Sequence, residues 1–267
     1  MAVFPIYKNP HNPYILLIPR KNSSSKTFSL DRTVELFKQA YRLKVSPKLY
    51  AFYPGTNEIQ LSNGILVRFS NCGDLVRVVN DRLLRSVKEK VDISIQICKQ
   101  IFALHQNHIY HGDIKPDNIV LETKKRSYVV KIIDFGAASK FFHVDNKPGS
   151  PDLMPPEYYV SELTPKNTYN AKRRDVYVLG LTLYSLFTGY FLHKKYPLDL
   201  EKYSKIEKIQ REEQIKQIHD NTIQNALCQD ILDQNVAKIL REFLQFYPKK
   251  RILLEKAISD FERIRIL

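Results

Sequence analysis

The chain has little glycine and little cysteine. Eight of its 267 residues are glycine, and none of these precedes Gly55. The N-terminal part therefore lacks a Gly-x-Gly-x-x-Gly loop, whose backbone commonly covers bound phosphates. The three cysteines, Cys72, Cys98 and Cys228, are odd in number and include no Cys-x-x-Cys pair. Neither a disulfide framework nor a zinc site is predicted, and a reducing compartment fits this pattern.

Long apolar runs are missing as well. The longest apolar stretch, residues 176–187, is interrupted by tyrosine, threonine and serine, and it is too short to cross a bilayer. The first ten residues lack the charged start and the apolar run of a signal peptide. We therefore expect no transmembrane segment and a cytoplasmic location.

Acidic residues are outnumbered by basic ones. The chain has 42 Lys and Arg against 28 Asp and Glu, a net charge of +14. This balance favours acidic partners, although the short basic clusters at residues 124–126 and 172–174 are more typical of a solvated, lysine-rich surface. With 43% hydrophobic and 26% charged residues, the chain is expected to fold as one large domain or two lobes.

Hydrophobic periodicity changes near residue 70. Before it, one helix is predicted to run to about residue 43, and four strands are predicted over residues 2–8, 14–18, 48–53 and 65–69. After it, the pattern is mostly helical. The predicted fold class is α+β, with an N-terminal lobe over residues 1–70, a helical C-terminal lobe over residues 71–267, and a crevice near residues 68–74.

Two short motifs in the second lobe indicate chemistry. Residues 111–120 read HGDIKPDNIV, and residues 131–136 read KIIDFG. Either motif alone is weak evidence of function. Together they place two aspartates, a lysine and an asparagine at the spacing that phosphoryl transfer uses, since this reaction depends on positioning and charge neutralisation more than on covalent chemistry.

Each polar residue of these motifs has a candidate role. Asp113 can accept the proton of an incoming hydroxyl, and Lys115 can place a cation at the transferred phosphate. Asn118 and Asp134 can supply oxygen ligands to Mg²⁺, a hard cation. Gly136 allows the chain to turn sharply after Asp134.

The chain resembles the eukaryotic-type protein kinase family over about residues 2–265. The catalytic-loop pattern HRDxKxxN appears at residues 111–118 as HGDIKPDN, and the DFG motif lies at residues 134–136. Residues 149–157, GSPDLMPPE, resemble the segment that ends in APE, and residues 175–180, DVYVLG, resemble the start of the family's central buried helix. Small-molecule phosphotransferases of the aminoglycoside type share the HGD triplet, but they are not expected to carry the other motifs.

This resemblance implies a bilobal protein-kinase-like fold and transfer of the γ-phosphoryl group of ATP, with Mg²⁺, to a serine or threonine hydroxyl of a protein. It also implies that Glu157 pairs with Arg251. Residues 67–75 resemble the family's hinge, which places Val67 as gatekeeper, Ser70 as the backbone partner of adenine and Asp74 near the ribose.

The N-terminal lobe departs from the family pattern. The first strand and the glycine loop are missing, so a truncated strand lobe is expected. In the register that the resemblance suggests, Leu17 stands where the phosphate-binding lysine is expected, while Glu35 matches the helix glutamate that positions this lysine. Lys8 or Lys21 can replace the lysine, or a protein partner can complete the lobe. The alternative is a catalytically silent pseudokinase that acts as a scaffold.

A second departure concerns regulation. Gly112 stands where many family members have an arginine that pairs with a phosphate on the activation segment. Phosphate on Ser139 or Ser150 therefore has no guanidinium partner at this position. The sequence predicts activity that does not depend on phosphorylation of this segment.

The reduced lobe resembles the small kinases that bacteria deliver into host cells or that large DNA viruses encode. This implies work in a host cytoplasm, reached without a cleavable signal peptide, and a host protein as substrate. An activating protein partner also fits this picture, and nucleic acid is not expected as a partner.

Overall fold

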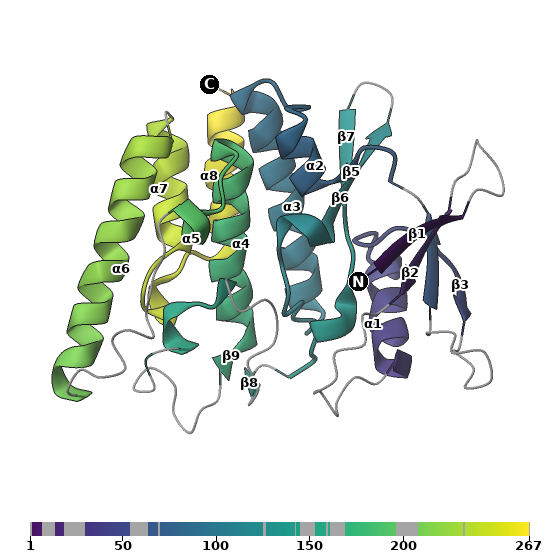
Figure 1. The fold of residues 1–267 in the computed structure, drawn as a ribbon, viewed down its shortest axis with the longest axis horizontal. Helices are drawn as coiled ribbons and strands as arrows, with labels where there is room; N and C mark the ends of the chain where they lie inside the picture. Colours follow the sequence, from purple (N-terminus) through teal and green to yellow (C-terminus); the bar gives the residue numbers. More distant parts are fainter. Residues whose placement is uncertain are drawn as a thin grey trace.

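The structure is a computed structural model in which a strand-rich part and a helical part lie side by side (Figure 1). It describes residues 2–6, 14–18, 30–53, 64–68, 70–124, 127–141, 143–144, 153–158, 160, 169–195, 208–231 and 233–266.

The N-terminal part is built on a four-stranded antiparallel sheet with the strand order β1-β2-β4-β3. Its strands are β1 (Ala2–Ile6), β2 (Tyr14–Ile18), β3 (Leu49–Tyr53) and β4 (Gly64–Arg68). Leu17 lies on the interior strand β2 and is paired with Val3 and Ile65. Four predicted strands therefore form one sheet, because β-branched and apolar residues alternate with turn signals along this part of the chain.

Helix α1 (Leu30–Arg42) packs beside this sheet and reaches the second lobe. Its buried face carries Thr33, Val34, Leu36, Phe37 and Ala40. The turn that follows α1 is tied to the second lobe, since the carbonyl of Val45 accepts from the backbone of Ile132 at 3.0 Å. This turn therefore fixes α1 relative to the catalytic region.

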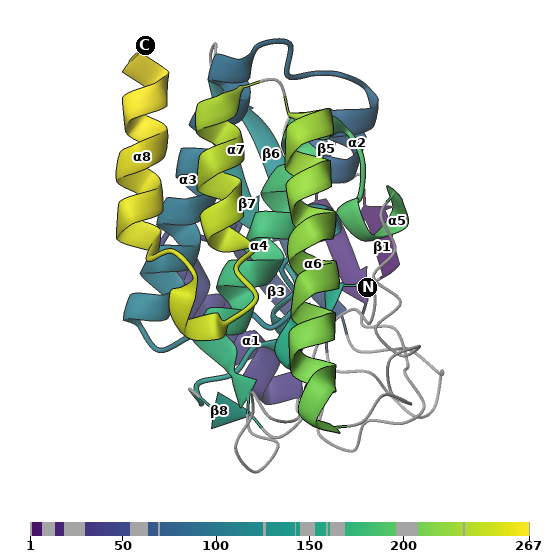
Figure 2. The same cartoon turned by 90° about the vertical axis from the view of Figure 1, so that its left-hand side faces the viewer.

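The C-terminal part is mostly helical. Its helices are α2 (Leu75–Asn80), α3 (Val87–Gln106), α4 (Ala171–Thr188), α5 (Leu192–Lys195), α6 (Lys208–Asp230), α7 (Gln234–Phe243) and α8 (Leu254–Ile266). Short strands β5 (Gly73–Asp74), β6 (Ile119–Lys124) and β7 (Ser127–Ile132) form one small sheet, and β8 (His143–Val144) and β9 (Tyr169–Asn170) pair with each other. Figure 2 shows α6, α7 and α8 side by side in front of α4.

Helix α4 is the centre of this lobe. The side chain of Asn170 caps its first turn by accepting from the backbone of Arg173 at 2.9 Å, and Gly189 ends the helix with φ of 79°. Buried residues occur on all its sides, including the charged Arg174 and Asp175. Such a helix belongs in a protein interior rather than on a surface.

The predicted fold class is confirmed by this arrangement, with a small strand lobe that carries one helix among the described residues and a helical second lobe. The predicted division at residue 70 stays a prediction. The charged sequence over residues 200–219 has a pattern that predicts a helix. Its first part, residues 200–207, lies outside the described residues, and α6 covers the rest and continues to Asp230. None of the helices that the structure describes is long and apolar enough to cross a membrane.

Candidate active site

The catalytic loop holds the carboxylate of Asp113 between two donors. Lys115 Nζ donates to Asp113 Oδ2 at 2.7 Å, and Asn118 Nδ2 donates to the same oxygen at 3.2 Å. Asn118 Nδ2 also donates to the backbone carbonyl of Asp113 at 2.8 Å. The carboxylate is half-buried. Three residues predicted as catalytic are therefore in direct contact.

His111 fixes this loop against the strand that precedes the DFG motif. Its Nε2 lies 3.0 Å from the carbonyl of Ile133, and its Nδ1 lies 3.3 Å from the backbone nitrogen of Asp113. Since a carbonyl can only accept and a backbone N–H can only donate, the ring carries its proton on Nε2. His111 therefore braces the catalytic loop.

Asp134 is brought near Asn118 by a backbone hydrogen bond of the residue before it, Ile133. The carbonyl of Asn118 accepts from the N–H of Ile133 at 2.9 Å. Asp134 itself has left-handed backbone angles, φ 65° and ψ 73°, and its Oδ1 accepts from Gly136 N at 3.2 Å. Strained backbone of this kind is found where a side chain must be aimed.

These two residues form a donor set that suits Mg²⁺. Both hydrogen bonds of the Asn118 amide use Nδ2 and face Asp113, which assigns its Oδ1 to the other side of the amide. Asp134 adds a half-buried carboxylate. Amide and carboxylate oxygens are the ligands that magnesium prefers. The predicted pair therefore fits the ion by its chemistry.

Buried Asp175, near the start of α4, holds the backbone of the catalytic loop through hydrogen bonds. Its Oδ2 accepts from the backbone of His111 at 2.8 Å and lies 3.0 Å from His105 Nε2, and its Oδ1 accepts from Gly112 N at 3.0 Å. Burial alone raises the pKa of Asp175, but the hydrogen bond and charge of His105, with the charge of Arg174, hold this pKa below its ordinary value.

The sequence did not show the roles of Asp175 and His105. Asp175 belongs to the motif at residues 175–180, but nothing in that motif indicates its contacts with residues 111–112 and with His105. The contact joins positions more than sixty residues apart, as the separation of 64 between His111 and Asp175 shows. The only signal was a carboxylate inside an otherwise apolar helix, which needs buried partners.

Gly112 has a conformation that other residues rarely adopt. Its φ is +78°, and a Cβ atom added there would lie 2.3 Å from the carbonyl oxygen of Ala137. That distance is far below van der Waals contact, and the neighbour is backbone. The arginine that many family members carry here is therefore excluded by sterics in this structure.

Helix α1 meets the DFG motif through an aromatic pair. The rings of Phe37 and Phe135 lie 5.7 Å apart at 80°, an edge-to-face contact. Thr33, one turn earlier, is buried on the same side of α1. Glu35 is fully exposed, and its Oε1 accepts from Gln39 at 2.9 Å, which lowers its pKa. The structure therefore does not bring Glu35 to the catalytic group.

The hinge residues lie where β4 passes into α2. Val67 and Ser70 are buried, and the carbonyl of Ser70 accepts from Gly73 N at 2.9 Å. Asp74 Oδ1 accepts from Arg77 N at 2.8 Å and caps α2. The structure thus gives Asp74 a structural task besides the predicted contact with ribose.

The Glu157–Arg251 pair is confirmed. Arg251 Nη1 donates to Glu157 Oε1 at 2.8 Å, its Nη2 contacts Oε2, and both residues are buried. The guanidinium also lies over the ring of Tyr177 at 4.7 Å. A bidentate pair of this kind fixes the segment near Glu157 to the C-terminal helices.

The candidate lysines Lys8 and Lys21 lie outside the described residues.

Comparison with known families agrees with this geometry. The family model described as protein kinase domain matches residues 35–260. The chain belongs to the protein kinase family, as its motifs predicted.

The curated relatives include kinases of several kinds of organism. The chain is 31% identical over 182 residues to calcium-dependent protein kinase 4 of Plasmodium berghei, which covers 67% of this chain and 33% of the relative. It is 35% identical over 169 residues to an Acanthamoeba polyphaga mimivirus protein named as a serine/threonine-protein kinase, which covers 61% and 52%. It is 32% identical over 130 residues to the ovarian-specific serine/threonine-protein kinase Lok of Drosophila melanogaster, which covers 47% and 26%. The matched part is thus between 26% and 52% of each relative's length.

Proposed function

We propose that the chain is an active serine/threonine protein kinase that transfers the γ-phosphoryl group of ATP to a protein hydroxyl. The observation that carries this proposal is the carboxylate of Asp113, which Lys115 and Asn118 hold at 2.7 and 3.2 Å. A scaffold has no physical need for this arrangement, whereas a hydroxyl acceptor needs a positioned base. The printed names of the matched relatives support serine and threonine as acceptors.

The proposed roles of the catalytic loop follow from its contacts. Asp113 accepts the hydrogen bond of the acceptor hydroxyl and takes its proton as the hydroxyl oxygen bonds to the γ-phosphorus of ATP. The bond between this phosphorus and the β–γ bridging oxygen breaks in the same transfer, and ADP leaves. Lys115 orients that carboxylate through its hydrogen bond at 2.7 Å, and its cation would stabilise charge on the transferred group. Asn118 holds the loop closed through its two hydrogen bonds to Asp113.

Asn118 and Asp134 are proposed to hold Mg²⁺, and Ser70 and Asp74 to lie against the adenine and ribose of ATP. When bound, Mg²⁺ would neutralise charge on the phosphate oxygens of ATP. The left-handed backbone of Asp134 and the hydrogen bond between Ile133 and Asn118 orient the two ligands in advance. Such preorganisation lowers the cost of binding the ion.

The substrate is proposed to be a host-cell protein, and the site of action the cytoplasm. The reduced strand lobe further supports an activating protein partner that completes the clamp on the phosphates. Lys8 or Lys21 is the alternative source of that clamp.

A silent scaffold is the second candidate. It is favoured by Glu35, which is exposed and bonded to Gln39 rather than turned toward the DFG motif. A glutamate in that position does not support a phosphate-binding lysine. This observation concerns only the lysine contact to the phosphates of ATP. It does not affect Asp113 as the base or Asn118 and Asp134 as the proposed metal ligands.

One experiment separates the two candidates. Purified chain is incubated with Mg²⁺, γ-labelled ATP and a mixture of general protein substrates, and the labelled amino acids are identified after hydrolysis. We expect label on serine and threonine, lost in Asp113→Ala and in the absence of Mg²⁺. An ATP-dependent rise in melting temperature without any label transfer would contradict the proposed kinase activity and support the scaffold.

A further inference from the structure

Helix α6 carries a buried histidine whose two ring nitrogens both make hydrogen bonds. His219 is fully buried. Its Nδ1 lies 3.0 Å from Asp220 Oδ1, and its Nε2 lies 3.1 Å from the hydroxyl oxygen of Tyr177 on α4. Since a carboxylate can only accept, Nδ1 carries a proton. In the neutral ring, Nε2 therefore accepts from the hydroxyl of Tyr177.

Two aromatic side chains connect this histidine to the Glu157–Arg251 pair. The guanidinium of Arg251 lies over the ring of Tyr177, 4.7 Å from its centre. The ring of Phe246 meets the ring of His219 edge-on at 5.5 Å, and the carbonyl of Phe246 accepts from Arg251 Nη2 at 3.3 Å. We call these five residues the His219 cluster. It joins α4 and α6 to the segment that carries Glu157.

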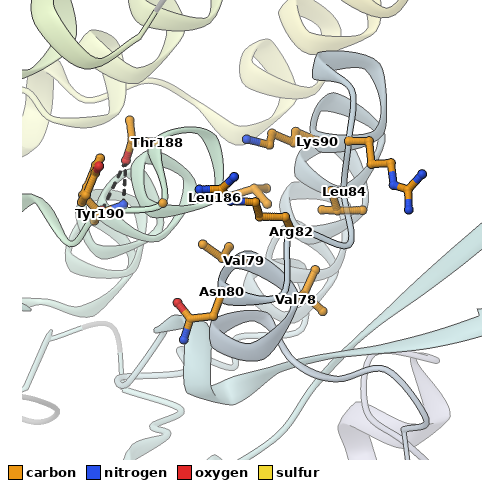
Figure 3. Close-up of a pocket in the computed structure, with 11 residues that line it drawn as sticks. Val78, Val79, Asn80, Arg82, Leu84, Lys90, Leu186, Thr188 and Tyr190 are labelled. Carbon is orange, nitrogen blue, oxygen red and sulfur yellow. Dashed lines mark hydrogen bonds between the residues drawn. The ribbon is translucent and has the colours of Figure 1, made fainter.

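The His219 cluster is shielded from solvent on all but one side. Its five members are each at most 3% exposed. A cavity of about 640 Å³ lies between the α2–α3 connection and the end of α4 (Figure 3), and none of the five lines it. A ligand in that cavity would therefore touch none of them. A proton can reach His219 through Asp220, whose side chain is 46% exposed.

The carboxylates near the His219 ring are already in use. Glu157 is bound to Arg251 through both oxygens, and Asp220 Oδ2 accepts from Lys216 Nζ at 2.6 Å. The charged and titratable groups that act on the ring or on its partners are Glu212, Glu213, Lys216 and Asp220 on α6, Arg173 and Tyr177 on α4, Tyr247 and Arg251 after α7, and Glu157. A second proton on the ring would thus add buried positive charge beside a carboxylate that is half-exposed and shared.

This environment keeps the ring neutral at neutral pH. Burial lowers the pKa of His219, the hydrogen bond and charge of Asp220 oppose this effect, and the charge of Arg251 adds to it. An unfolded histidine has a pKa of about 6.5. Because the folded pKa lies below that value, the neutral ring stabilises the fold fully above about pH 6.5. This contribution is lost as the pH falls through that value toward the folded pKa.

We propose that His219 is an acid-sensitive switch: when its ring takes up a second proton from solvent, the contact of Arg251 with Glu157 weakens and residues 153–158 separate from the helical lobe. Protonated Nε2 donates to Tyr177 instead of accepting from it, so the hydroxyl must direct its own proton elsewhere. A further cation also lies buried near Arg251, which is costly unless it is paired. This inference does not rest on the proposed phosphoryl transfer.

Hydrogen exchange of the full chain, measured by mass spectrometry, tests this proposal. The backbone N–H groups of Tyr158 and Val160 are the reporters, since they donate to the carbonyls of Pro155 and Pro156 at 3.0 and 3.2 Å. Labelling times are scaled to the intrinsic exchange rate at each pH, and α8 is the reference. From about pH 7.5 to about pH 5.5, opening of the reporter segment should increase about threefold to tenfold relative to α8, because opening returns the ring to its ordinary pKa of about 6.5.

Three variants assign this effect to the ring. His219→Gln does not titrate but keeps an oxygen that can accept from Tyr177, so the acid-induced increase should disappear. Asp220→Asn removes the carboxylate that raises the pKa of His219, so the increase should begin at lower pH. The matched control is His108→Asn, which removes an exposed histidine that follows α3 and should keep the full increase.

Melting curves at neutral pH check that each variant is folded. If His219→Gln does not fold, the ring signals of the histidines are titrated by NMR in the natural chain. One signal should then titrate in step with opening of the reporter segment, and its midpoint should move to lower pH in Asp220→Asn.

Three results would overturn the proposal. The first is an equal increase in the natural chain and in His219→Gln, and the second is no increase beyond that of α8 in the natural chain. The third is an increase that begins at the same pH in Asp220→Asn, since the ring would then not be the group that takes up the proton.

Discussion

Single residues set the shape of the catalytic loop, and Gly112 is the clearest case. A positive φ costs other residues about 1–2 kcal/mol, and a side chain at this position would also collide with the carbonyl of Ala137. We expect Gly112→Ala to lower the free energy of unfolding by about 3 kcal/mol and to abolish label transfer.

Gly189→Ala is the matched control for this substitution. Gly189 has nearly the same φ, +79°, but an added Cβ would meet only Val79 Cγ1 at 3.9 Å. Gly189→Ala should lower the free energy of unfolding by about 1 kcal/mol, which is the cost of the backbone angle alone. Urea unfolding compares the two variants, and equal losses would show that the contact with Ala137 is unimportant.

Asp175 makes a second prediction at this scale, concerning pH. Its folded pKa is held below the ordinary value, so its carboxylate stabilises the fold fully above the unfolded pKa of about 3.9. That contribution is lost as the pH falls through the lowered folded pKa. We expect Asp175→Asn to cost about 3 kcal/mol at neutral pH, and the difference from the natural chain to narrow only below about pH 4.

Unfolding measured from pH 7 to pH 3 gives this difference directly. The control is Asp81→Asn, which removes an exposed pair with Arg77 and should cost less than about 1 kcal/mol. If Asp175→Asn lowers the free energy of unfolding no more than the control does, the buried hydrogen bonds to residues 111–112 contribute little to stability.

At the scale of elements, helix α1 decides which of its side chains reach the active site. Residues two positions apart point to nearly opposite sides of a helix, so the contact of Phe37 with Phe135 directs Glu35 outward. If Glu35 positioned a phosphate-binding lysine, as the sequence pattern suggests, its substitution would raise the KM for ATP. Because Glu35 is exposed and faces away from the DFG motif, we expect no such rise.

Glu35→Gln should therefore change the KM for ATP by less than about twofold, as should Glu213→Gln on the exposed surface of α6. Steady-state kinetics at varied ATP checks this expectation. A tenfold rise confined to Glu35→Gln would mean that α1 turns when nucleotide binds.

Elements with long amphipathic patterns were predictable from the sequence. The amphipathic pattern over residues 254–266 predicts the helix that α8 forms, because its apolar positions repeat at helical spacing over several turns. Helix α2 was missed, since its six residues give less than two turns of periodicity. The direction of Glu35 was missed because it depends on Phe135, a packing partner far along the chain.

At the scale of the whole molecule, motifs distant in sequence meet at one place. Motif identity predicted Asp113, Lys115 and Asn118 as a group, and the resemblance predicted the Glu157–Arg251 pair. Neither indicated the support from Asp175, nor the hydrogen bond that joins His219 to Tyr177. Such features arise from tertiary packing, which local patterns do not encode.

The molecule as a whole combines a helical lobe, which carries Asp113 and Asp134, with a small strand lobe. The two parts are joined by the hydrogen bond between Ile132 and Val45 and by Lys131 Nζ, which donates to the carbonyl of Lys44 at 2.6 Å. Our central claim is that Asp113, in the helical lobe, is the base that positions the acceptor hydroxyl for phosphoryl transfer.

The most direct test of this claim is the rate of label transfer from ATP under single-turnover conditions, measured together with ATP affinity, in the natural chain and in Asp113→Asn. The substitution keeps the shape of the side chain but removes its negative charge. We predict that the rate falls at least about a hundredfold while ATP affinity in the presence of Mg²⁺ changes less than about threefold. An unchanged rate in Asp113→Asn would contradict the account.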